Sequence, residues 1–368
     1  MRKTTRMVVL GIVSACALTI SSTAFAAFTS PRLFASQPDQ KNRIDLLYTQ
    51  STADDNVAKV AHYVPVPYRL NLSAKPSGTQ VGSAVLRTNL ASRSNQNFVL
   101  SGVIEVGTAA TTFTRGGTSS TLGAAALACT GSATQTAYWV ARLRDAGGDV
   151  TYDLPIFVNR LAAATAFEAD ATITTCFQNP AAAPLGMKVR EFNLGLIRVL
   201  TTPAKGDIRW STLATPYSAA GAVNNAGTVE VQSIVQYPRA VSLRAPVRVK
   251  LTSGFATFKF DGSVTVPVVD NPRVSLFRGA TKVQAGSRSA SAYTIKRGAG
   301  NFTKLHTIKR NRTTAQTFYF QVRAFVPNQI QGKAGCVTNF HPNVECINAT
   351  RAGYMVRSRT VMVRVPQA

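Results

Sequence analysis

Few residues of this 368-residue chain have the types that carry out enzymatic chemistry, and they are far apart in sequence. Its three histidines are His62, His306 and His341, and no serine or cysteine beside them forms a nucleophile motif. His62 lies in an apolar, strand-like run, from which it could meet Asp54 or Asp55 in space; an ordinary strand histidine is the competing interpretation. No catalytic residue is therefore assigned, and the sequence leans against an enzyme without deciding the question.

Carboxylates form two small groups that invite interpretation as a metal site. Residues 54–56, Asp-Asp-Asn, offer the hard oxygen ligands that Ca²⁺ prefers, but the alternating acids and later glutamate of a calcium loop are missing. A solvated loop is the alternative. Asp145, Asp149 and Asp153 lie around the Gly-Gly pair 147–148, which can take the positive φ of a tight hairpin, so we expect turn chemistry from them. We expect neither a metal nor a cofactor, and nothing marks the paired carboxylates of a glycosidase.

Exposed aromatic residues could supply a platform for sugar rings. The best candidates are the pairs Tyr138/Trp139 and Trp210/Tyr217. Tyr138 and Trp139 are adjacent, so they point to opposite faces of a strand, and one of them is expected in the core. A sugar platform made by this set stays a hypothesis.

The first 26 residues have the pattern of a secretory signal peptide. Arg2, Lys3 and Arg6 precede an apolar run over 7–20, and the segment ends on Ala-Phe-Ala, so cleavage after Ala26 is expected. An alternative takes 13–16, Val-Ser-Ala-Cys, as a lipoprotein box that would lipidate the cysteine. The apolar run is shorter than a membrane span of about 18 residues, and no later stretch reaches that length, so we expect a secreted protein.

Cleavage after residue 26 leaves four cysteines, Cys129, Cys176, Cys336 and Cys346, an even set that favours disulfides in an exported protein. Three connectivities are possible, and local folding favours Cys129 with Cys176 and Cys336 with Cys346. Loops of these lengths correspond to about 4 and about 3 kcal/mol in the chain-entropy model. No pair has the spacing of a redox or zinc motif.

The charge is concentrated in the last third of the chain. Residues 27–235 hold 17 Lys plus Arg and 13 Asp plus Glu, a net charge of +4, whereas 236–368 hold 21 against 3, a net charge of +18. A magnitude of about 2 to 8 is enough for solubility. An excess of this size attracts polyanions.

The mature chain is predicted to be all-β. Runs rich in β-branched and aromatic residues alternate with clusters of Gly, Pro, Asn and Asp. The strands expected before residue 236 are 60–64, 67–72, 98–106, 137–143, 150–158, 169–177, 189–200 and 229–235. Small-residue stretches at 116–132 and 218–227 are expected to be loops, and the first could hold a short helix around 122–128.

The pattern changes after residue 235. Residues 236–251, QYPRAVSLRAPVRVKL, are interpreted as a proline-marked linker that runs into a new first strand. Further on, apolar residues alternate with polar or basic ones, which places one set of side chains inward and the other in water. About seven strands at this spacing predict a sandwich. We therefore expect a β-sandwich module over 27–235 and a second, basic β-sandwich over 236–368.

Two stretches of the second module carry a family resemblance. Residues 260–279, FDGSVTVPVVDNPRVSLFRG, and 298–324, GAGNFTKLHTIKRNRTTAQTFYFQVRA, resemble the immunoglobulin-like repeats of bacterial secreted and surface proteins. The resemblance implies an immunoglobulin-like sandwich. Unlike antibody-type domains, the module has no Trp, and its two cysteines are close together. In the first module, YWVARL, IRWSTLATPYS and AGTVEVQSIV resemble the leading module of two-module secreted proteins from actinobacteria, which offer no activity to transfer.

The letters Thr-Ile-Lys-Arg occur twice, at 294–297 and 307–310. If 291–297 and 302–310 are strands joined by 298–301, they form an antiparallel hairpin with one Lys-Arg pair at each end. The repeat would then spread charge over an outer face instead of forming one patch. The residues expected to bind a polyanion are Lys296, Arg297, Lys309, Arg310, Arg312 and Arg323.

These features favour a secreted, non-enzymatic surface or matrix protein whose basic C-terminal module associates with an anionic polymer, such as a cell-wall polymer or an acidic polysaccharide. Aromatic residues are not interleaved with the cations, so sequence-specific nucleic-acid recognition is not expected. The alternative is a secreted carbohydrate-binding protein or hydrolase with its site in the N-terminal module. A concave pocket with convergent acids in 27–235 would favour that alternative.

Overall fold

The computed structural model describes residues 28–37, 43–72, 75–91, 94, 96–161, 168–183, 185–201, 203, 205–267, 269–336 and 340–368. The expected signal peptide, with Cys16, lies outside the described residues. Strands dominate, in one large mixed sheet and several smaller sheets, which confirms the predicted β character. Within the described ranges, no helix has the length and apolar character needed to cross a membrane.

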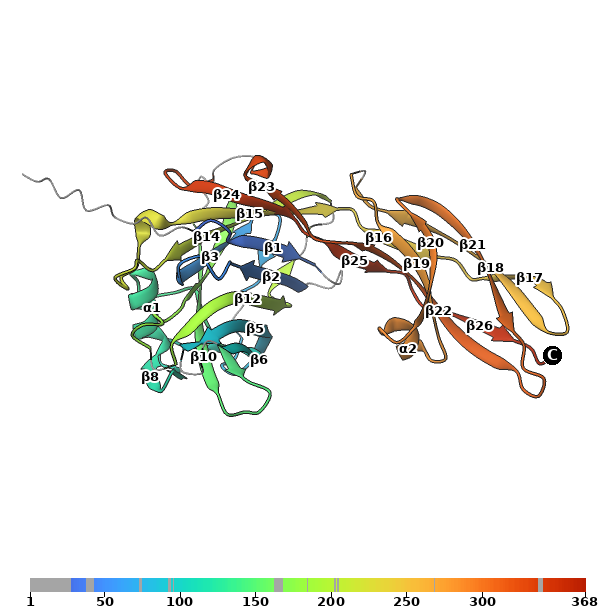
Figure 1. Ribbon diagram of the computed structural model, residues 1–368, viewed down its shortest axis with the longest axis horizontal. Coiled ribbons are helices and arrows are strands. Elements are labelled where there is room, and N and C mark those ends of the chain that lie inside the picture. The colour runs from blue at the N-terminus through green and yellow to red at the C-terminus, as the bar shows by residue number, and fades with distance from the viewer. Residues whose placement is uncertain are drawn as a thin grey trace, which may run out of the picture.

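The large sheet, sheet I, has 13 strands and occupies one end of the molecule (Figure 1). In spatial order its strands are β1 (Arg32–Ser36), β2 (Arg43–Thr49), β12 (Met187–Ile197), β5 (Gln80–Leu90), β6 (Gln96–Gly107), β9 (Ala137–Arg144), β10 (Thr151–Arg160), β11 (Ala169–Cys176), β3 (Val57–Pro65), β14 (Gly206–Pro216), β15 (Val229–Tyr237), β24 (Glu345–Arg351) and β23 (Gln329–Gly332). Neighbouring strands are antiparallel except β15 and β24, which run parallel. Sheet I thus contains strands from both predicted modules.

The sequence pattern of sheet I explains how it buries its core. Residues in β1 and β2 alternate strictly between buried and half-buried positions, as the period of two in a strand requires. The largest fully buried side chains include Trp139, Trp210, Tyr48, Tyr152 and Phe192. Each such side chain contributes about 1.5 to 3 kcal/mol through the area that it removes from water.

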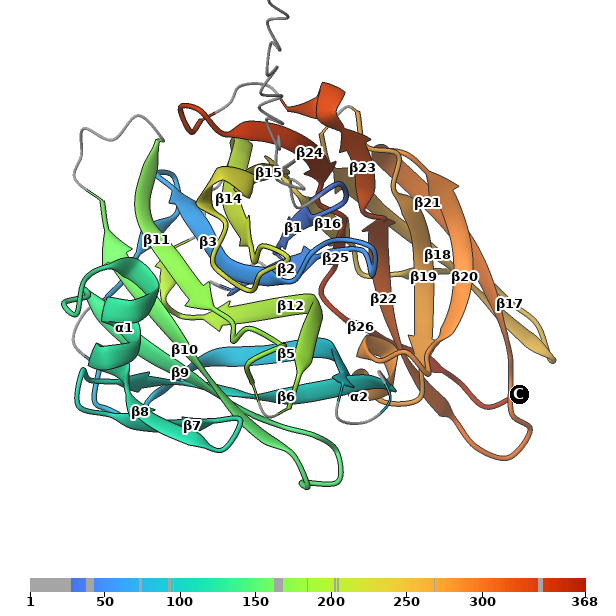
Figure 2. The same ribbon diagram turned by 60° about the vertical axis from the view of Figure 1, so that its left-hand side comes forward.

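Sheet I curls over so that its first strand lies against strands near its other edge (Figure 2). The amide of Ala35 in β1 donates a hydrogen bond to Ser233 Oγ of β15 at 2.9 Å. The hydroxyl of Thr350 in β24 donates to the carbonyl of Leu33. The strands of the predicted first sandwich therefore form one continuous sheet that folds around a single hydrophobic core.

Short elements complete this part of the chain. Two small ladders pair β4 (Arg69–Leu70) with β13 (Leu200–Thr201) and β7 (Thr112–Arg115) with β8 (Thr118–Thr121), and η2 (Asn225–Gly227) is a single 3₁₀ turn. The predicted short helix is present as α1 (Leu122–Thr130). Thr121 caps its N-terminus, and Gly131 ends it with a φ of 79° that favours glycine. The predicted bond between Cys129 and Cys176 fastens α1 to β11.

Two smaller sheets form the other end of the molecule (Figure 1). Sheet II comprises β16 (Ala240–Leu243), β17 (Val247–Leu251), β18 (Phe255–Thr265) and β21 (Gly300–Lys309). Sheet III comprises β20 (Ser291–Arg297), β19 (Arg273–Gly279), β22 (Gln316–Val326), β25 (Tyr354–Arg357) and β26 (Val361–Val365). Their inward side chains share a second hydrophobic core. The short helix α2 (Lys282–Gly286) lies against β19 and β22.

The chain leaves sheet III between β22 and β25 and returns to sheet I. This returning segment, residues 329–351, holds β23, the turn η3 (Lys333–Gly335) and β24. Its strand β24 pairs with β15 over Val229–Ile234 and Glu345–Arg351. The predicted disulfide between Cys336 and Cys346 is also formed, and it closes this segment on itself. The sequence assigned 236–368 to one sandwich and did not anticipate that part of it joins the first sheet.

Charged and aromatic side chains fill the junction between the two ends. Asp270 accepts hydrogen bonds from Tyr354 Oη at 2.7 Å and from Arg351 Nη2 at 3.2 Å. The side chains of Asp270 and Arg351 are only 5% and 13% exposed. The guanidinium of Arg239 stacks over the Tyr354 ring, 3.8 Å from its centre. The two ends are thus joined by a buried ion pair as well as by strand pairing.

The return path depends on one glycine at the junction. A Cβ atom on Gly353 would lie 2.4 Å from the amide nitrogen of Asn328 and 2.6 Å from the carbonyl oxygen of Val326. Both are backbone atoms, so neither can move aside at low cost. The Gly353 amide donates to Asn328 Oδ1 at 2.6 Å. The outgoing and incoming strands therefore cross where only glycine fits.

Replacing Asp270 with alanine should destabilise the whole protein by about 3 to 5 kcal/mol, because Arg351 would keep a buried charge without its carboxylate. Urea unfolding of the full chain measures this change. Asp261→Ala is the matched control, since Asp261 forms an ion pair with Lys259 whose side chains are 31% and 43% exposed. The control should unfold almost as the parent does. If the two variants had equal free energies of unfolding, the buried ion pair at the junction would contribute no more to stability than an exposed ion pair.

Candidate functional site

The six cations predicted to bind a polyanion do not form one surface. Arg323 is buried, and its Nη2 donates to the carbonyls of Ala285 and Ser287. Its guanidinium also stacks over Phe277, 3.9 Å from the ring centre. Because these contacts hold α2 against sheet III, Arg323 fastens a helix and is not part of the exposed cationic surface.

Two more of the six are engaged with the main chain. The guanidinium of Arg310 donates to the carbonyls of Thr252, Pro366 and Gln367, which ties the C-terminal residues to sheet II. The ammonium of Lys296 donates to the carbonyls of Ala299 at 2.6 Å and Asn301 at 3.0 Å. Both residues add charge to the surface, but their donors already have partners.

The other three, Arg297, Lys309 and Arg312, are exposed. The expected hairpin between the two Thr-Ile-Lys-Arg runs is wrong, because β20 pairs in sheet III and β21 pairs in sheet II. The chain crosses between the sheets at Gly298 and Gly300, whose φ values of 87° and 92° suit glycine. The repeated letters therefore lie on two different sheets.

Strand register reveals a cationic surface that sequence reasoning missed. On the outer side of sheet II, Val247, Lys259 and Leu305 are directly opposite one another on three neighbouring strands. Lys250 is opposite Thr257 and Thr307 in the next row, and Phe255 is opposite Lys309 in the row after that. We define the lysine–apolar face as the three lysines and three apolar residues of these rows: Val247, Lys250, Phe255, Lys259, Leu305 and Lys309. Val247, Phe255 and Leu305 are 60%, 50% and 58% exposed, so apolar and cationic groups are both open to a ligand.

Acids do little to offset the charge of residues 236–368. Asp261 is paired with Lys259, Asp270 with Arg351, and Glu345 with Lys333. These are the three acids of that range, which also holds 21 basic residues, so cations outnumber carboxylates there sevenfold. Arg273 is moreover opposite Arg297 in the ladder of sheet III. Like charges in that position are destabilising, so the cations are not arranged for stability alone.

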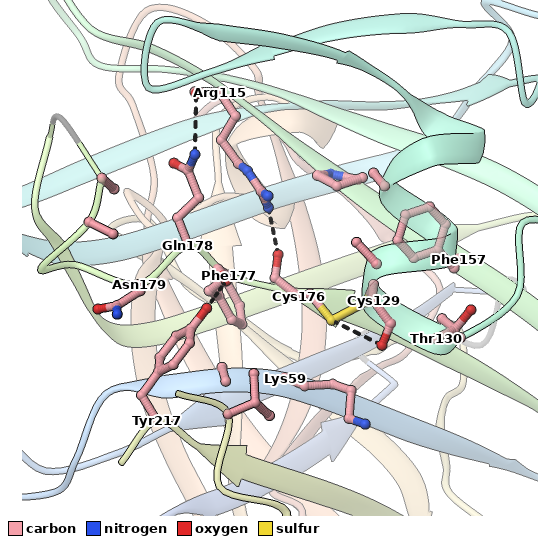
Figure 3. A pocket seen from close by; sticks show the side chains of 18 of the residues that line it. Lys59, Arg115, Cys129, Thr130, Phe157, Cys176, Phe177, Gln178, Asn179 and Tyr217 are labelled. Carbon is pink, nitrogen blue, oxygen red and sulfur yellow. Dashed lines mark hydrogen bonds between the residues drawn. A yellow bond between two sulfur atoms is a disulfide. The ribbon is translucent and has the colours of Figure 1, made fainter. Parts of the chain in front are cut away.

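A pocket of about 630 Å³ lies at the other end of the molecule, around the Cys129–Cys176 bond (Figure 3). We call it the disulfide pocket. Lys59 comes from β3, directly opposite Cys176 on β11, and Arg115 comes from the end of β7. These two are the charged residues among the described residues that line it, and no carboxylate is among them. The convergent acids expected of a hydrolase are thus missing from its lining.

Several polar side chains of the disulfide pocket are held by main-chain carbonyls, some of which Figure 3 shows. Arg115 Nη1 donates to the carbonyl of Cys176 at 2.7 Å, and Tyr217 Oη donates to that of Phe177 at 2.7 Å. Asn179 Nδ2 donates to the carbonyl of Gly221 at 2.9 Å. Burial raises the pKa of Tyr217, so this hydroxyl stays a donor at neutral pH. The pocket wall is therefore fixed before any ligand arrives.

Two other sequence candidates have structural roles. Asp54 is buried and accepts hydrogen bonds from the amides of Thr29 and Ser51 and from the hydroxyls of Thr29 and Ser30. Although burial acts to raise the pKa of Asp54, these hydrogen bonds lower it overall. His62 meets Thr212 at 2.8 Å, not an aspartate. The described residues contain no group of three His, Cys, Asp or Glu side chains able to hold a metal.

The structure also shows where the aromatic candidates and one of the turn aspartates lie. Trp139 and Trp210 are 2% and 0% exposed, so neither can stack on a sugar. Tyr217 belongs to the disulfide pocket. Asp145 accepts from the amide of Val150 at 3.0 Å in the β9–β10 hairpin, which is the expected turn role.

A buried polar network fastens the returning segment and was invisible in the sequence. The carboxylate of Glu230 accepts from Ser211 Oγ at 2.7 Å and from the amide of Phe340 at 3.1 Å. His341 Nε2 is 3.2 Å from Ser211 Oγ. The Ser211 hydroxyl donates to Glu230, so its proton is directed at that carboxyl group and not at His341. The network anchors residues that are more than 100 positions apart in sequence.

No protein-family model matches this chain, and no curated protein matches its sequence. The lysine–apolar face and the disulfide pocket are two features of the structure that can support a functional proposal.

Histidine protonation should make the protein less stable in mild acid. Burial lowers the pKa of His62 to about 3 and, as the largest cause, those of His306 and His341 to about 4. Unfolded histidine titrates near pH ~6.5, so below that pH the unfolded state binds more protons than the folded state. The unfolding free energy should be flat above about pH 7 and fall as the pH drops toward 4, by up to about 1.4 kcal/mol per pH unit for His62.

Urea unfolding of the parent and of His62→Gln at about pH 7.5, 6 and 5 tests this account. The variant lacks one of the three proton-accepting groups, so its stability should decline less steeply with falling pH. If both proteins lose stability at the same rate, His62 does not stay neutral inside the fold.

Proposed function

We propose that this is a secreted, non-enzymatic surface or matrix protein, and that its basic C-terminal unit holds it to an anionic polymer such as a cell-wall polymer or an acidic polysaccharide. The observation that carries the proposal is the lysine–apolar face, together with the pairing of all three acids of 236–368. Two formed disulfides are consistent with an oxidising, extracellular environment. Cleavage after Ala26 is part of the proposal.

We also propose that sheets II and III form an immunoglobulin-like sandwich. In support, β18 is flanked by β16 and β17 on one side and by β21 on the other, while β19 and β22 are central in the facing sheet. Both sheets bury alternate residues in one shared core. The unit would differ from antibody-type domains because its disulfide lies in the returning segment instead of linking the sheets.

Spread charge suits a polymer better than a small ligand. Exposed cations lie on both sheets, with Lys250 and Lys309 on sheet II and Arg273, Arg297 and Arg357 on sheet III. A polyanion that contacts several of them releases condensed counterions, so its affinity falls with salt. Val247, Phe255 and Leu305 would pack against apolar parts of the same polymer, such as the C–H faces of sugar rings. Many weak contacts would share the binding free energy, so no single residue of the face would be indispensable.

The double variant Lys250→Gln, Lys309→Gln should bind heparin, used as the polyanion, about two- to thirtyfold more weakly than the parent, because each of the two exposed contacts contributes about 0.2 to 1 kcal/mol. Binding to immobilised heparin at several salt concentrations measures both affinity and its salt dependence. The full chain is used because the returning segment pairs with sheet I.

The matched control is Arg69→Gln, Arg144→Gln, which removes two exposed cations from the sheet I end. It changes the net charge equally and should keep nearly the parent affinity. Equal loss in both double variants would mean that net charge alone sets binding. Binding that ignores salt, or a complete loss from one substitution, would contradict a spread-charge surface.

A further inference from the structure

We infer that the disulfide pocket is a second ligand site, and that its ligand is a small acidic sugar, a hydroxylated ring bearing one carboxylate. The inference stands on the pocket alone and does not rest on the proposed binding of a polymer. The sugar rings of a polymer and a free acidic sugar share this chemistry, so the test below uses a free monosaccharide.

The charged side chains that line the pocket favour an anionic ligand. Lys59 and Arg115 line it without any carboxylate among the described lining residues. Arg115 has one nitrogen committed to the Cys176 carbonyl, which fixes the plane of the guanidinium. A planar guanidinium held in place recognises a carboxylate through charge-assisted hydrogen bonds. Lys59 is beside the disulfide on the neighbouring strand and adds a second positive charge.

The neutral lining suits a ring that carries several hydroxyl groups. Amide and hydroxyl side chains dominate the polar part of the wall, and they are Thr130, Gln178, Asn179, Tyr217 and Asn225. Apolar side chains face the same space and can pack on the C–H side of a ring.

Size and rigidity are also appropriate. A cavity of about 630 Å³ is in the range of small-molecule sites and accommodates one or two sugar rings. Its wall is preorganised by main-chain hydrogen bonds and by the disulfide, which fixes the C-terminal turn of α1 to β11. Binding to such a wall costs little ordering entropy.

Isothermal titration of the full protein with D-glucuronate, D-glucose and acetate tests the assignment. Glucuronate should bind with a dissociation constant below about 10 mM, and both glucose and acetate should bind at least about fivefold more weakly. Arg115→Gln and Lys59→Gln should each weaken glucuronate binding by at least about fivefold, since each removes a hydrogen bond to a charged group. Arg144→Gln, an exposed arginine outside the pocket, should leave it unchanged.

Circular dichroism and a free-thiol assay confirm that each variant is folded with its disulfides intact, and Arg115→Lys, which keeps the charge, should retain part of the affinity. Glucose binding equal to that of glucuronate would overturn the role of the cations. Acetate binding equal to that of glucuronate would overturn the sugar assignment. Parent affinity in folded Arg115→Gln and Lys59→Gln would overturn the site. Heparin binding is measured separately, so failure here leaves the polymer proposal unaffected.

Discussion

The parallel pairing of β24 with β15 is the interaction on which the rest of the structure depends. It brings the segment between β22 and β25 of the C-terminal unit into the sheet of the N-terminal unit, so the two ends are joined by a ladder and not by a linker alone. The Glu230 network, the Asp270–Arg351 pair and the close backbone approach at Gly353 all lie along this path. The basic end is therefore held in one orientation relative to the disulfide pocket.

Local pattern predicted much of the fold but not this connection. Alternation and turn residues located most strands, alanine content suggested α1, and an even cysteine count with short loops predicted both disulfides. These signals act within about fifty residues of sequence. The partner of β24 is more than 100 residues away, and nothing in the letters of 345–351 distinguishes a strand of sheet I from one of sheet III.

The two candidate sites likewise combine features that the local sequence pattern predicts with features that only the folded structure shows. Exposed cations such as Arg297 and Lys309 follow from charge and alternation, whereas Arg323 also occupies an outward strand position and is nonetheless buried, because α2 lies over it. The lysine–apolar face depends on register across three strands, which sequence does not specify. The disulfide pocket is lined by side chains from β3, β7, β11 and the loops near 179 and 217. No single stretch of sequence contains enough of these residues to predict the pocket. The sequence predicted where the positive charge is concentrated, but it could not predict which of the cationic side chains are exposed.

A protein built this way would present a polymer-binding surface at one end and a small-ligand pocket at the other, with a fixed frame between them. Native-state hydrogen exchange tests that frame most directly. The amides of 229–234 and 345–351 that pair in the parallel ladder should be protected as strongly as those of the central strands of sheet I, such as β10 and β11. If the amides of 345–351 exchange as fast as exposed loops while 229–234 stays protected, the returning segment does not join sheet I, and the account is wrong.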